Sequence, residues 1–256
     1  MEERSTPTEP IAVDRSGHFR ILAPLLVIAL IAGGLVAYYV YRQAFASVPS
    51  QARKRDLAQE ARDDLESRKF RPLSAPLADL LADPKYDPIP TQAHTLLLQP
   101  APDFTLFDVN GKEFSLAKEL KEGPVVLVFY YGYHCNHCVS QLFALDKDLE
   151  KFHELGVKVV TISADPSELT RERFKQYGAF KFPVLSDPGN KIAEKYETYV
   201  ASAKAGQEGD LMHGTFVISR QGKIVWTNRG DTPFTENRTL LHEVARAEGR
   251  LPAKTR

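Results

Sequence analysis

The chain has 256 residues, and its 33 lysines and arginines balance 33 aspartates and glutamates, so the formal net charge is zero. This length allows one good-sized domain with accessory segments. Because basic and acidic residues are interleaved, the sequence offers no basic face for nucleic acid, and we expect no nucleic-acid partner.

The first notable segment is an uncharged run over residues 21–40, ILAPLLVIALIAGGLVAYYV, which lies between Arg20 and Arg42. A helix rises about 1.5 Å per residue, so this run is long enough to cross the roughly 30 Å hydrocarbon core of a bilayer. We therefore expect a short N-terminal tail over 1–20 and a single transmembrane anchor over 21–41, which makes the membrane itself a partner.

The sequence leaves two properties of this anchor undecided: whether it is cleaved, and on which side of the membrane the domain lies. Ala44-Phe45-Ala46 resembles a signal-peptidase site, but the apolar run is longer than that of a signal peptide, which favours an uncleaved anchor. Basic residues on the two sides of the run slightly favour a cytoplasmic C-terminal side. A short tail with one anchor more often exports the domain after it, so we expect an extracytoplasmic domain.

A spacer is expected between the anchor and the domain, over residues 42–97. Its first part is rich in charged residues, alanine and leucine, and pairs such as Arg62 and Glu66 indicate a solvated helix. Five prolines occur between Pro72 and Pro90, which is typical of an extended arm. We assign no chemistry to this spacer.

The domain proper is expected over residues 98–256 as an alternating α/β arrangement. Asn110-Gly111 predicts a hairpin after the first strand, and Gly156 predicts the end of the longest helix. The expected strands are 103–109, a short one after Gly111, 125–131, 157–163, 183–185, 215–219 and 223–227. The expected helices are one that starts at the cysteine motif and ends before Gly156, followed by helices over 167–177, 190–196 and 235–247.

The most informative motif is Cys135-Asn136-His137-Cys138, which contains both cysteines of the chain and lies where the apolar strand 125–131 gives way to a helix. Two thiols at this spacing can close a disulfide within one helical turn, and the helix dipole favours the thiolate of the first. A cationic imidazole beside a thiol lowers the thiol's pKa, so His134 and His137 are candidate thiolate-tuning residues. Cys135 is the expected nucleophile and Cys138 the resolving cysteine.

Blander interpretations of the same residues remain. A structural zinc site needs four ligands, and the chain has no second pair of cysteines, so histidines would have to complete it. A purely structural disulfide across one helical turn closes too small a loop to stabilise the fold much. Two unreactive buried thiols, or a solvated histidine at the helix start, are also open.

Several short motifs together resemble the peroxiredoxin-related redoxins of the AhpC/TSA superfamily. The motifs are Ala101-Pro102-Asp103-Phe104, Asn110-Gly111-Lys112, Ser115-Leu116, Ile162-Ser163-Ala164-Asp165, Phe182-Pro183-Val184-Leu185-Ser186-Asp187, Thr215-Phe216-Val217-Ile218 and Gly222-Lys223-Ile224. The resemblance covers roughly residues 98–248, and the run from Gly132 to Cys138 is similar to the CxxC-bearing branch.

This resemblance implies a thioredoxin-like fold, a central mixed sheet flanked by helices, with Cys135 at the position of the peroxidatic cysteine. It implies a thiol-dependent, antioxidant oxidoreductase that cycles Cys135 and Cys138 between dithiol and disulfide and needs no further cofactor. The implied partners are a peroxide or a protein disulfide and an external thiol electron donor. Gly132, His213 and Gly214 are the expected site-lining residues.

Departures from the family pattern keep alternatives open. Gly132 and Val128 stand where peroxiredoxins have threonine or serine and proline, and Met212-His213-Gly214 lacks their arginine. Gly214 also stands where a thioredoxin would have a cis-proline. A protein thiol-disulfide oxidoreductase without peroxidase activity is therefore one alternative. A Sco-like copper-binding redoxin that uses Cys135, Cys138 and His213 is a second, although our first expectation is that no metal is bound.

Overall fold

The computed structural model describes residues 31–39, 56–133, 135–204 and 209–252. The chain divides into two compact units, Met1–Arg55 and Asp56–Arg256. In the first unit, residues 31–39 are helical and exposed. No helix in the described part of the chain is both long and apolar enough to cross a bilayer. The rest of the expected anchor at 21–41, and the expected tail at 1–20, lie outside the described residues.

The second unit is built on a seven-stranded mixed sheet in the order β2-β1-β5-β4-β3-β8-β9. β3 is central, parallel to β4 and antiparallel to β8, and β1 is antiparallel to both β2 and β5. The strands are β1 (Thr105–Asp108), β2 (Glu113–Ser115), β3 (Val125–Phe129), β4 (Lys158–Ser163), β5 (Val184–Ser186), β8 (His213–Ile218) and β9 (Ile224–Gly230).

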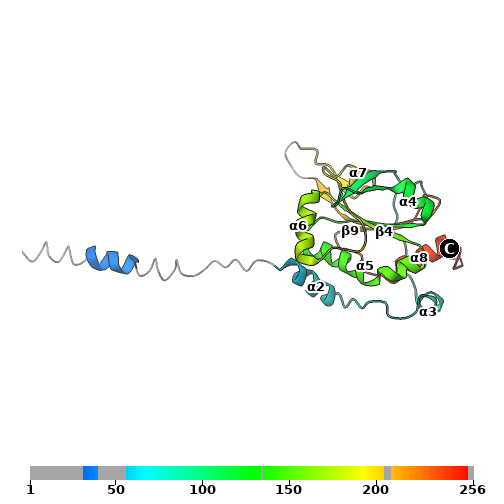
Figure 1. The fold of residues 1–256 in the computed structure, drawn as a ribbon, viewed down its shortest axis with the longest axis horizontal. Helices are drawn as coiled ribbons and strands as arrows, with labels where there is room; N and C mark the ends of the chain where they lie inside the picture. Colours follow the sequence, from blue (N-terminus) through cyan, green and yellow to red (C-terminus); the bar gives the residue numbers. More distant parts are fainter. Residues whose placement is uncertain (1–30, 40–55, 134, 205–208, 253–256) are drawn as a thin grey trace, which may run out of the picture. The chain divides into compact units, whose positions relative to one another are not determined.

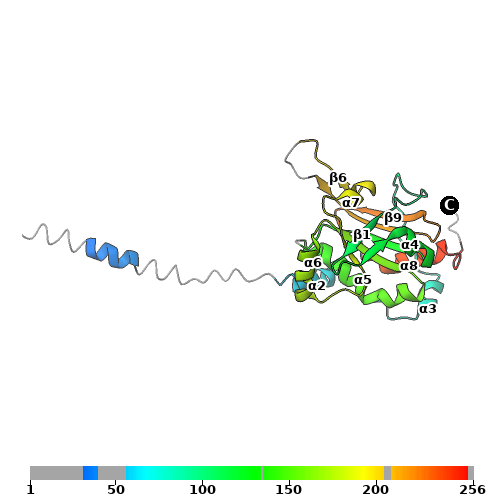
Figure 2. The same cartoon turned by 45° about the horizontal axis from the view of Figure 1, so that its top comes forward.

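Helices cover both faces of this sheet (Figure 1). α4 (Leu116–Glu122) and α7 (Lys191–Lys195) lie on one side, and α5 (Asn136–Glu154) and α8 (Asn237–Ala247) lie on the other. α6 (Ser167–Tyr177) contributes Phe174 and Tyr177 to the side of α5. A separate two-stranded sheet, β6 (Tyr199–Val200) with β7 (Asp210–Leu211), comes after α7 in the chain, and Figure 2 places β6 beside that helix. This architecture is the expected thioredoxin-like α/β fold.

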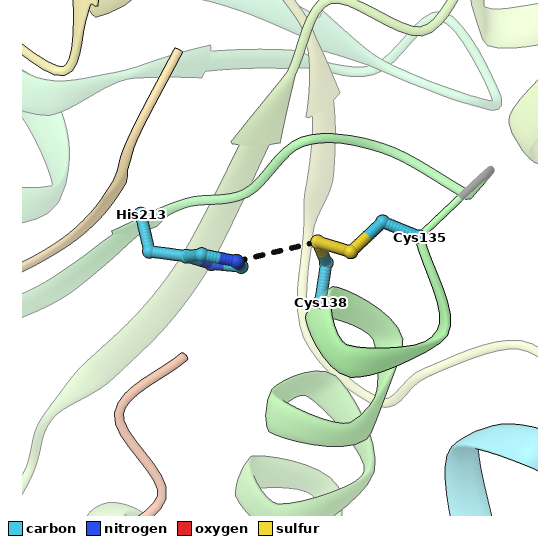
Figure 3. Close-up of side chains that lie close together, drawn as sticks. All are labelled: Cys135, Cys138 and His213. Carbon is cyan, nitrogen blue, oxygen red and sulfur yellow. Dashed lines mark hydrogen bonds between the residues drawn. A yellow bond between two sulfur atoms is a disulfide. The ribbon is translucent and has the colours of Figure 1, made fainter. Parts of the chain in front are cut away.

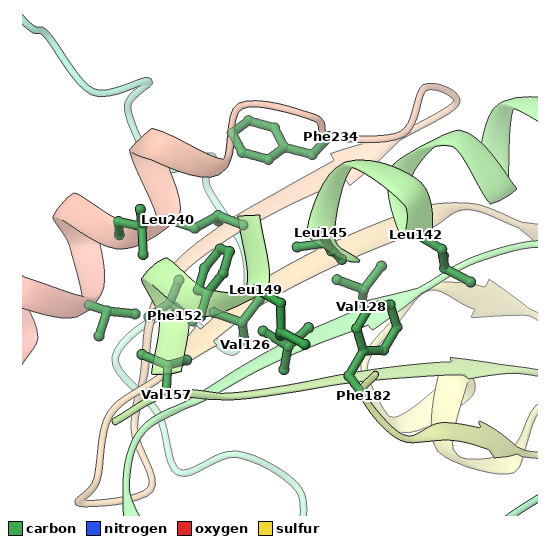
Figure 4. Close-up of a cluster of buried hydrophobic side chains, with 14 of the residues drawn as sticks. Val126, Val128, Leu142, Leu145, Leu149, Phe152, Val157, Phe182, Phe234 and Leu240 are labelled. Atoms are coloured by element: carbon green, nitrogen blue, oxygen red, sulfur yellow. The ribbon is translucent and has the colours of Figure 1, made fainter. Parts of the chain in front are cut away.

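Burial of β3 on both faces explains its unbroken apolar sequence. All five of its residues are buried, and alternate side chains enter different cores. Val126 and Val128 join the cluster under α5 and α8, which Figure 4 shows around Leu142, Leu145 and Phe152. Val125, Leu127 and Phe129 join the cluster on the opposite face. The strand therefore anchors both layers and fixes the place from which the loop to the cysteine motif starts.

The predicted elements between residues 103 and 247 are all present with small differences at their ends. The long helix after the cysteines ends at Glu154, and Gly156 takes a φ of 73° as the chain turns into β4, as expected for a glycine after a helix end. The prediction lacked α4 and the β6–β7 pair, because these elements are too short to show the apolar periodicity on which such predictions rest.

The domain boundary differs from the expected one near residue 98, since the compact unit begins at Asp56. α2 (Leu57–Ser67) is not a solvated spacer helix. It packs beside α5 (Figure 1), and its buried side chains recur every three or four residues after the first pair: Leu57, Ala58, Ala61 and Leu65. These positions form an apolar stripe that is more stable against α5 than in water.

The proline-containing stretch is also part of the domain. α3 (Leu77–Ala82) lies against α8, where the Arg238 guanidinium donates to the Leu80 carbonyl at 2.7 Å and pairs with Asp83 at 2.8 Å. Further along, residues 92–101 run beside β9: the Gln92 and Leu98 amides donate to the Thr227 and Ile224 carbonyls. Residues 56–97 therefore fold onto the domain because their apolar and backbone groups find partners there.

Candidate active site

The two cysteines lie at the start of α5, just beyond the C-terminal end of β3. Cys135 is the N-cap residue of α5, and its sulfur forms a disulfide with Cys138 in the first turn (Figure 3). The Cα atoms are 5.4 Å apart, and the Cys138 amide donates to the Cys135 carbonyl at 3.2 Å. A disulfide thus fits within the helix start without displacing it.

The two sulfurs have different access to solvent. Cys138 is completely buried in the core under α5, whereas Cys135 is only partly buried and packs at the edge of the same core. In thiol chemistry the accessible sulfur meets the incoming molecule, and access decides which sulfur reacts. The geometry therefore suits Cys135 as the nucleophile and Cys138 as the resolving residue.

His213, the first residue of β8, lies directly beside the buried sulfur. Its Nε2 is 3.3 Å from Cys138 Sγ, and its ring packs against Tyr131 with centroids 4.6 Å apart. The dashed line in Figure 3 marks the contact with Cys138. Burial lowers the pKa of His213 to about 4, with smaller contributions from the Arg68 guanidinium and from His137. At neutral pH this imidazole is uncharged, so its Nε2 can accept a hydrogen bond from a Cys138 thiol.

The other two candidate histidines differ in what the structure describes. His134 lies outside the described residues. His137 is exposed, and its Nδ1 is hydrogen-bonded to Asp64 Oδ1 of α2. His137 therefore contacts Asp64, a residue that the sequence analysis placed in the spacer over 42–97.

Gly132 shapes the loop that leads to the cysteines. It has a φ of 106°, a conformation that other residues rarely adopt, and a Cβ there would lie 2.7 Å from both carboxylate oxygens of Asp165. The same carboxylate accepts the Tyr133 amide proton at 2.8 Å. Gly132 is thus required by the close approach of Asp165 to the loop and supplies no chemical group itself.

Gly214 follows His213 on β8, but successive residues of a strand face opposite sides of the sheet. A Cβ at Gly214 would lie 2.3 Å from Cγ2 of Thr198 and 2.9 Å from the Phe216 ring. Phe216 belongs to the core on the other face of the sheet from Cys138, so the geometry gives Gly214 a packing role.

A cavity of about 440 Å³ opens close to this site. It shares Tyr131 with the His213 contact and Asp165 with the Gly132 loop. Its lining residues are Tyr131, Ala164, Asp165, Asn190, Tyr199, Gly209 and Leu211. The cavity is larger than a hydrogen peroxide molecule needs, so it has room for an organic substituent or a peptide side chain.

The donor atoms of Cys135, Cys138 and His213 all lie within 4.8 Å of one another, which is a set that could hold a metal ion. Two thiolates and an imidazole suit Cu(I). In the oxidised form the sulfurs are bonded to each other, so metal binding would require the dithiol. Copper binding stays a prediction.

Two residues near the site, Asp64 and Arg68, were missed by sequence reasoning, and both come from the segment of α2. Their spacing of four residues matches a helical ion pair, and the pair is formed at 2.7 Å. The apolar repeat of Ala58, Ala61 and Leu65 was the available signal that this helix docks on the domain. Which surface it would contact could not be read from that repeat.

The chain has recognisable relatives among protein families, curated proteins and solved structures. The AhpC/TSA family model matches residues 97–227, half of the chain. Chloroplastic peroxiredoxin Q of Suaeda salsa is 34% identical over 132 residues, which cover 50% of this chain and 58% of that protein. The thiol-disulfide oxidoreductase ResA of a Bacillus cereus strain is 31% identical over 125 residues, 49% of this chain and 65% of that protein.

The matches to these curated relatives thus span between half and two-thirds of the relatives' length. Among solved structures, the crystal structure of peroxidoxin BcpB from Mycobacterium tuberculosis superposes with a TM-score of 0.53 at 24% identity. The superposition covers 59% of this chain and 98% of that one. At this identity the likeness establishes the shared fold.

Proposed function

Because the chain belongs to the AhpC/TSA family, we propose that it is a thiol-dependent oxidoreductase in which Cys135 and Cys138 alternate between dithiol and disulfide. The observation that carries this proposal is the disulfide at the start of α5, with one partly accessible and one buried sulfur. A structural crosslink has no need of this asymmetry, whereas an attacking and a resolving cysteine do.

Peroxide is the first candidate oxidant. The Cys135 thiolate attacks one peroxide oxygen, the O–O bond breaks, and the other oxygen leaves with a proton as water or an alcohol. Cys135 is then a sulfenic acid. Cys138 attacks its sulfur, the hydroxyl leaves as water, and the disulfide forms. The two thiols have supplied the two electrons, and an external dithiol or two monothiols return them.

His213 has a clear place in the second of these steps. Resolution needs the Cys138 thiolate, but a buried thiol in apolar surroundings has a raised pKa. An uncharged imidazole 3.3 Å away can accept a hydrogen bond from the Cys138 thiol and take up its proton as the S–S bond forms, because the thiol becomes acidic only at that stage. In the reductive half of the cycle, the same group can return the proton to Cys138 as that sulfur leaves.

A protein disulfide is the second candidate substrate. The thiolate of Cys135 would form a mixed disulfide, which Cys138 then attacks to release the reduced partner. The support is the close CxxC spacing, the similarity to ResA and the cavity beside Tyr131. Gly132 lacks the hydroxyl that peroxiredoxins have at this position, which weakens the case for fast peroxide reduction.

One experiment separates the two substrates. The reduced full-length chain in detergent receives one equivalent of hydrogen peroxide, and mass spectrometry measures the loss of two hydrogens against time. A Cys135–Cys138 disulfide that forms within seconds supports peroxide reduction. If peroxide oxidises the two thiols slowly but the pair equilibrates rapidly with a glutathione buffer, the substrate is a protein disulfide and not a peroxide. The full chain is used because residues 56–97 are part of the domain.

The redox-active disulfide needs no additional cofactor in this proposal. If reduced protein takes up one Cu(I) tightly and loses it in both Cys135→Ser and His213→Ala, the copper-binding alternative replaces the oxidoreductase one. The support for this alternative is the close grouping of the Cys135, Cys138 and His213 donor atoms.

The proposed location is a membrane, with residues 21–41 as a single anchor and the redoxin domain on the extracytoplasmic side. Support comes from the 20-residue uncharged run and from the exposed apolar side chains of the helical residues 31–39, including Leu35 and Val36. In water these side chains would be unfavourably placed.

A further inference from the structure

Asp64 of α2 contacts the first turn of the active-site helix from outside the family match. Its Oδ1 accepts a hydrogen bond from Nδ1 of His137, and its Oδ2 lies 2.6 Å from Ser140 Oγ. The Arg68 guanidinium donates to Oδ2 at 2.7 Å. Two residues of α5, and the C-cap residue of α2, therefore converge on a single carboxylate whose side chain is only 9% exposed.

This carboxylate is held in its ionised form. Burial raises the pKa of Asp64, but hydrogen bonds from Arg68, Ser140 and His137 together outweigh that effect and leave the pKa below its ordinary value. A negative charge is thus fixed at the start of α5, in direct contact with the His137 ring.

His137 lies between the cysteines in the sequence, two residues after Cys135 and one before Cys138. A carboxylate that binds Nδ1 orients the ring, sets which nitrogen carries the proton and polarises the imidazole. His137 and Cys138 belong to the first turn of α5 and Cys135 is its N-cap residue, so an oriented and polarised imidazole in this turn can stabilise the thiolate and with it the reduced form.

We propose that Asp64 is a positioning residue that acts through His137 to stabilise the reduced form of the Cys135–Cys138 pair. In this proposal α2, which lies before the segment that matches the family, contributes a residue that affects the redox equilibrium of the cysteine pair. This inference rests on the proposed function, since it concerns the same pair of thiols.

A structural role can be separated from this one. α2 is seated on α5 by Leu57, Ala58, Ala61 and Leu65, so the loss of one charge leaves its packing intact. Asp64→Asn keeps the size and a hydrogen-bond acceptor but removes the charge. Asp63→Asn removes the same charge one residue away, where the carboxylate is exposed and its hydrogen bond lies within α2, to Gln59.

The test measures the equilibrium in which the protein disulfide and two glutathione molecules give the protein dithiol and glutathione disulfide. In Asp64→Asn we expect the equilibrium constant to shift about tenfold toward the protein disulfide, which corresponds to about 30 mV. Asp63→Asn should match the wild type. An unchanged constant in Asp64→Asn, or a shift toward the dithiol, overturns the proposal.

The route through His137 is tested by combining the substitutions. In a His137→Ala background, Asp64→Asn should leave the constant unchanged. A shift of the same size there would mean that Arg68 or the bare charge carries the effect, and would overturn the proposal. If the wild-type pair does not equilibrate with glutathione at all, the proposed function itself fails, which is a distinct outcome.

Discussion

His213 Nε2 and Cys138 Sγ lie 3.3 Å apart, although 75 residues separate them in the sequence. The register of the sheet produces this contact. β8 pairs antiparallel with β3, and its first residue therefore lies beside the loop that leaves the end of β3. An uncharged base is thereby buried against the sulfur that solvent does not reach.

We expect the two thiols of the reduced protein to react unequally. With limiting iodoacetamide, Cys135 should be alkylated at least about tenfold faster than Cys138, because reactivity depends on access and thiolate character. Peptide mapping by mass spectrometry measures the ratio. Equal labelling, or preferential labelling of Cys138 in a protein that remains folded, would contradict the assigned roles.

Cys135→Ser should abolish turnover with either oxidant.

Stability should fall in acid partly because of His213. Its folded-state pKa is lowered to about 4, so between that value and the unfolded value near 6.5 the unfolded chain binds a proton that the folded chain does not. The contribution is present at neutral pH and is lost as the pH falls. Between pH 7 and pH 5 the loss amounts to about 2 kcal/mol.

Urea unfolding of the oxidised protein at both pH values measures this effect, and His213→Gln provides the comparison. The variant should lose about 2 kcal/mol less than the wild type over the same interval. Other titrating groups are common to both proteins and cancel in the difference. If the free energy of unfolding falls by the same amount in both proteins between pH 7 and pH 5, the pKa of His213 is not lowered by folding.

Gly132→Ala should destabilise the protein by about 1 to 3 kcal/mol more than Gly111→Ala, because only the first adds a close contact. Both glycines have positive φ, but nothing lies within 4 Å of a Cβ at Gly111, whereas the Asp165 carboxylate meets one at Gly132. Urea denaturation of the two variants gives the comparison. If both substitutions lower the free energy of unfolding equally, the positive φ alone explains the glycine at 132, and the contact with Asp165 does not contribute.

Docking of α2 can be broken from its buried face. Ala61 is fully buried against α5, so Ala61→Arg should cost about 1 to 3 kcal/mol and open the chain after Ser67 to limited proteolysis. Asp63→Arg, on the exposed face of the same helix, should do neither. Similar digestion patterns for both variants would mean that α2 is not held by this packing.

The anchor is tested by fractionation. The full chain should sediment with membranes and resist extraction at alkaline pH, and deletion of residues 21–40 should release it. Cooperative urea unfolding of the shortened chain serves as the check that it is folded. Full-length protein in the soluble fraction would remove the membrane proposal without affecting the redox one.

Much of the domain was predictable from residues 103–247, because strands such as Val125–Phe129 and the helix after Cys138 have strong apolar patterns. The position of Cys135 at a helix start followed from the same pattern. The contribution of residues 56–97 was not predictable. Asp64 meets His137 across 73 residues, and only tertiary packing brings a helix with ordinary surface charges to that place.

The segment that runs beside β9 has a consequence for self-association. β9 is the last strand of the sheet, and an unpaired edge strand is a template for another chain. Here the Leu98 and Ala101 amides donate to the Ile224 and Gly222 carbonyls, and the Gln99 carbonyl accepts from the Ile224 amide. The chain thus shields part of its own open edge, and two copies cannot join β9 to β9 along that part without first peeling this segment away.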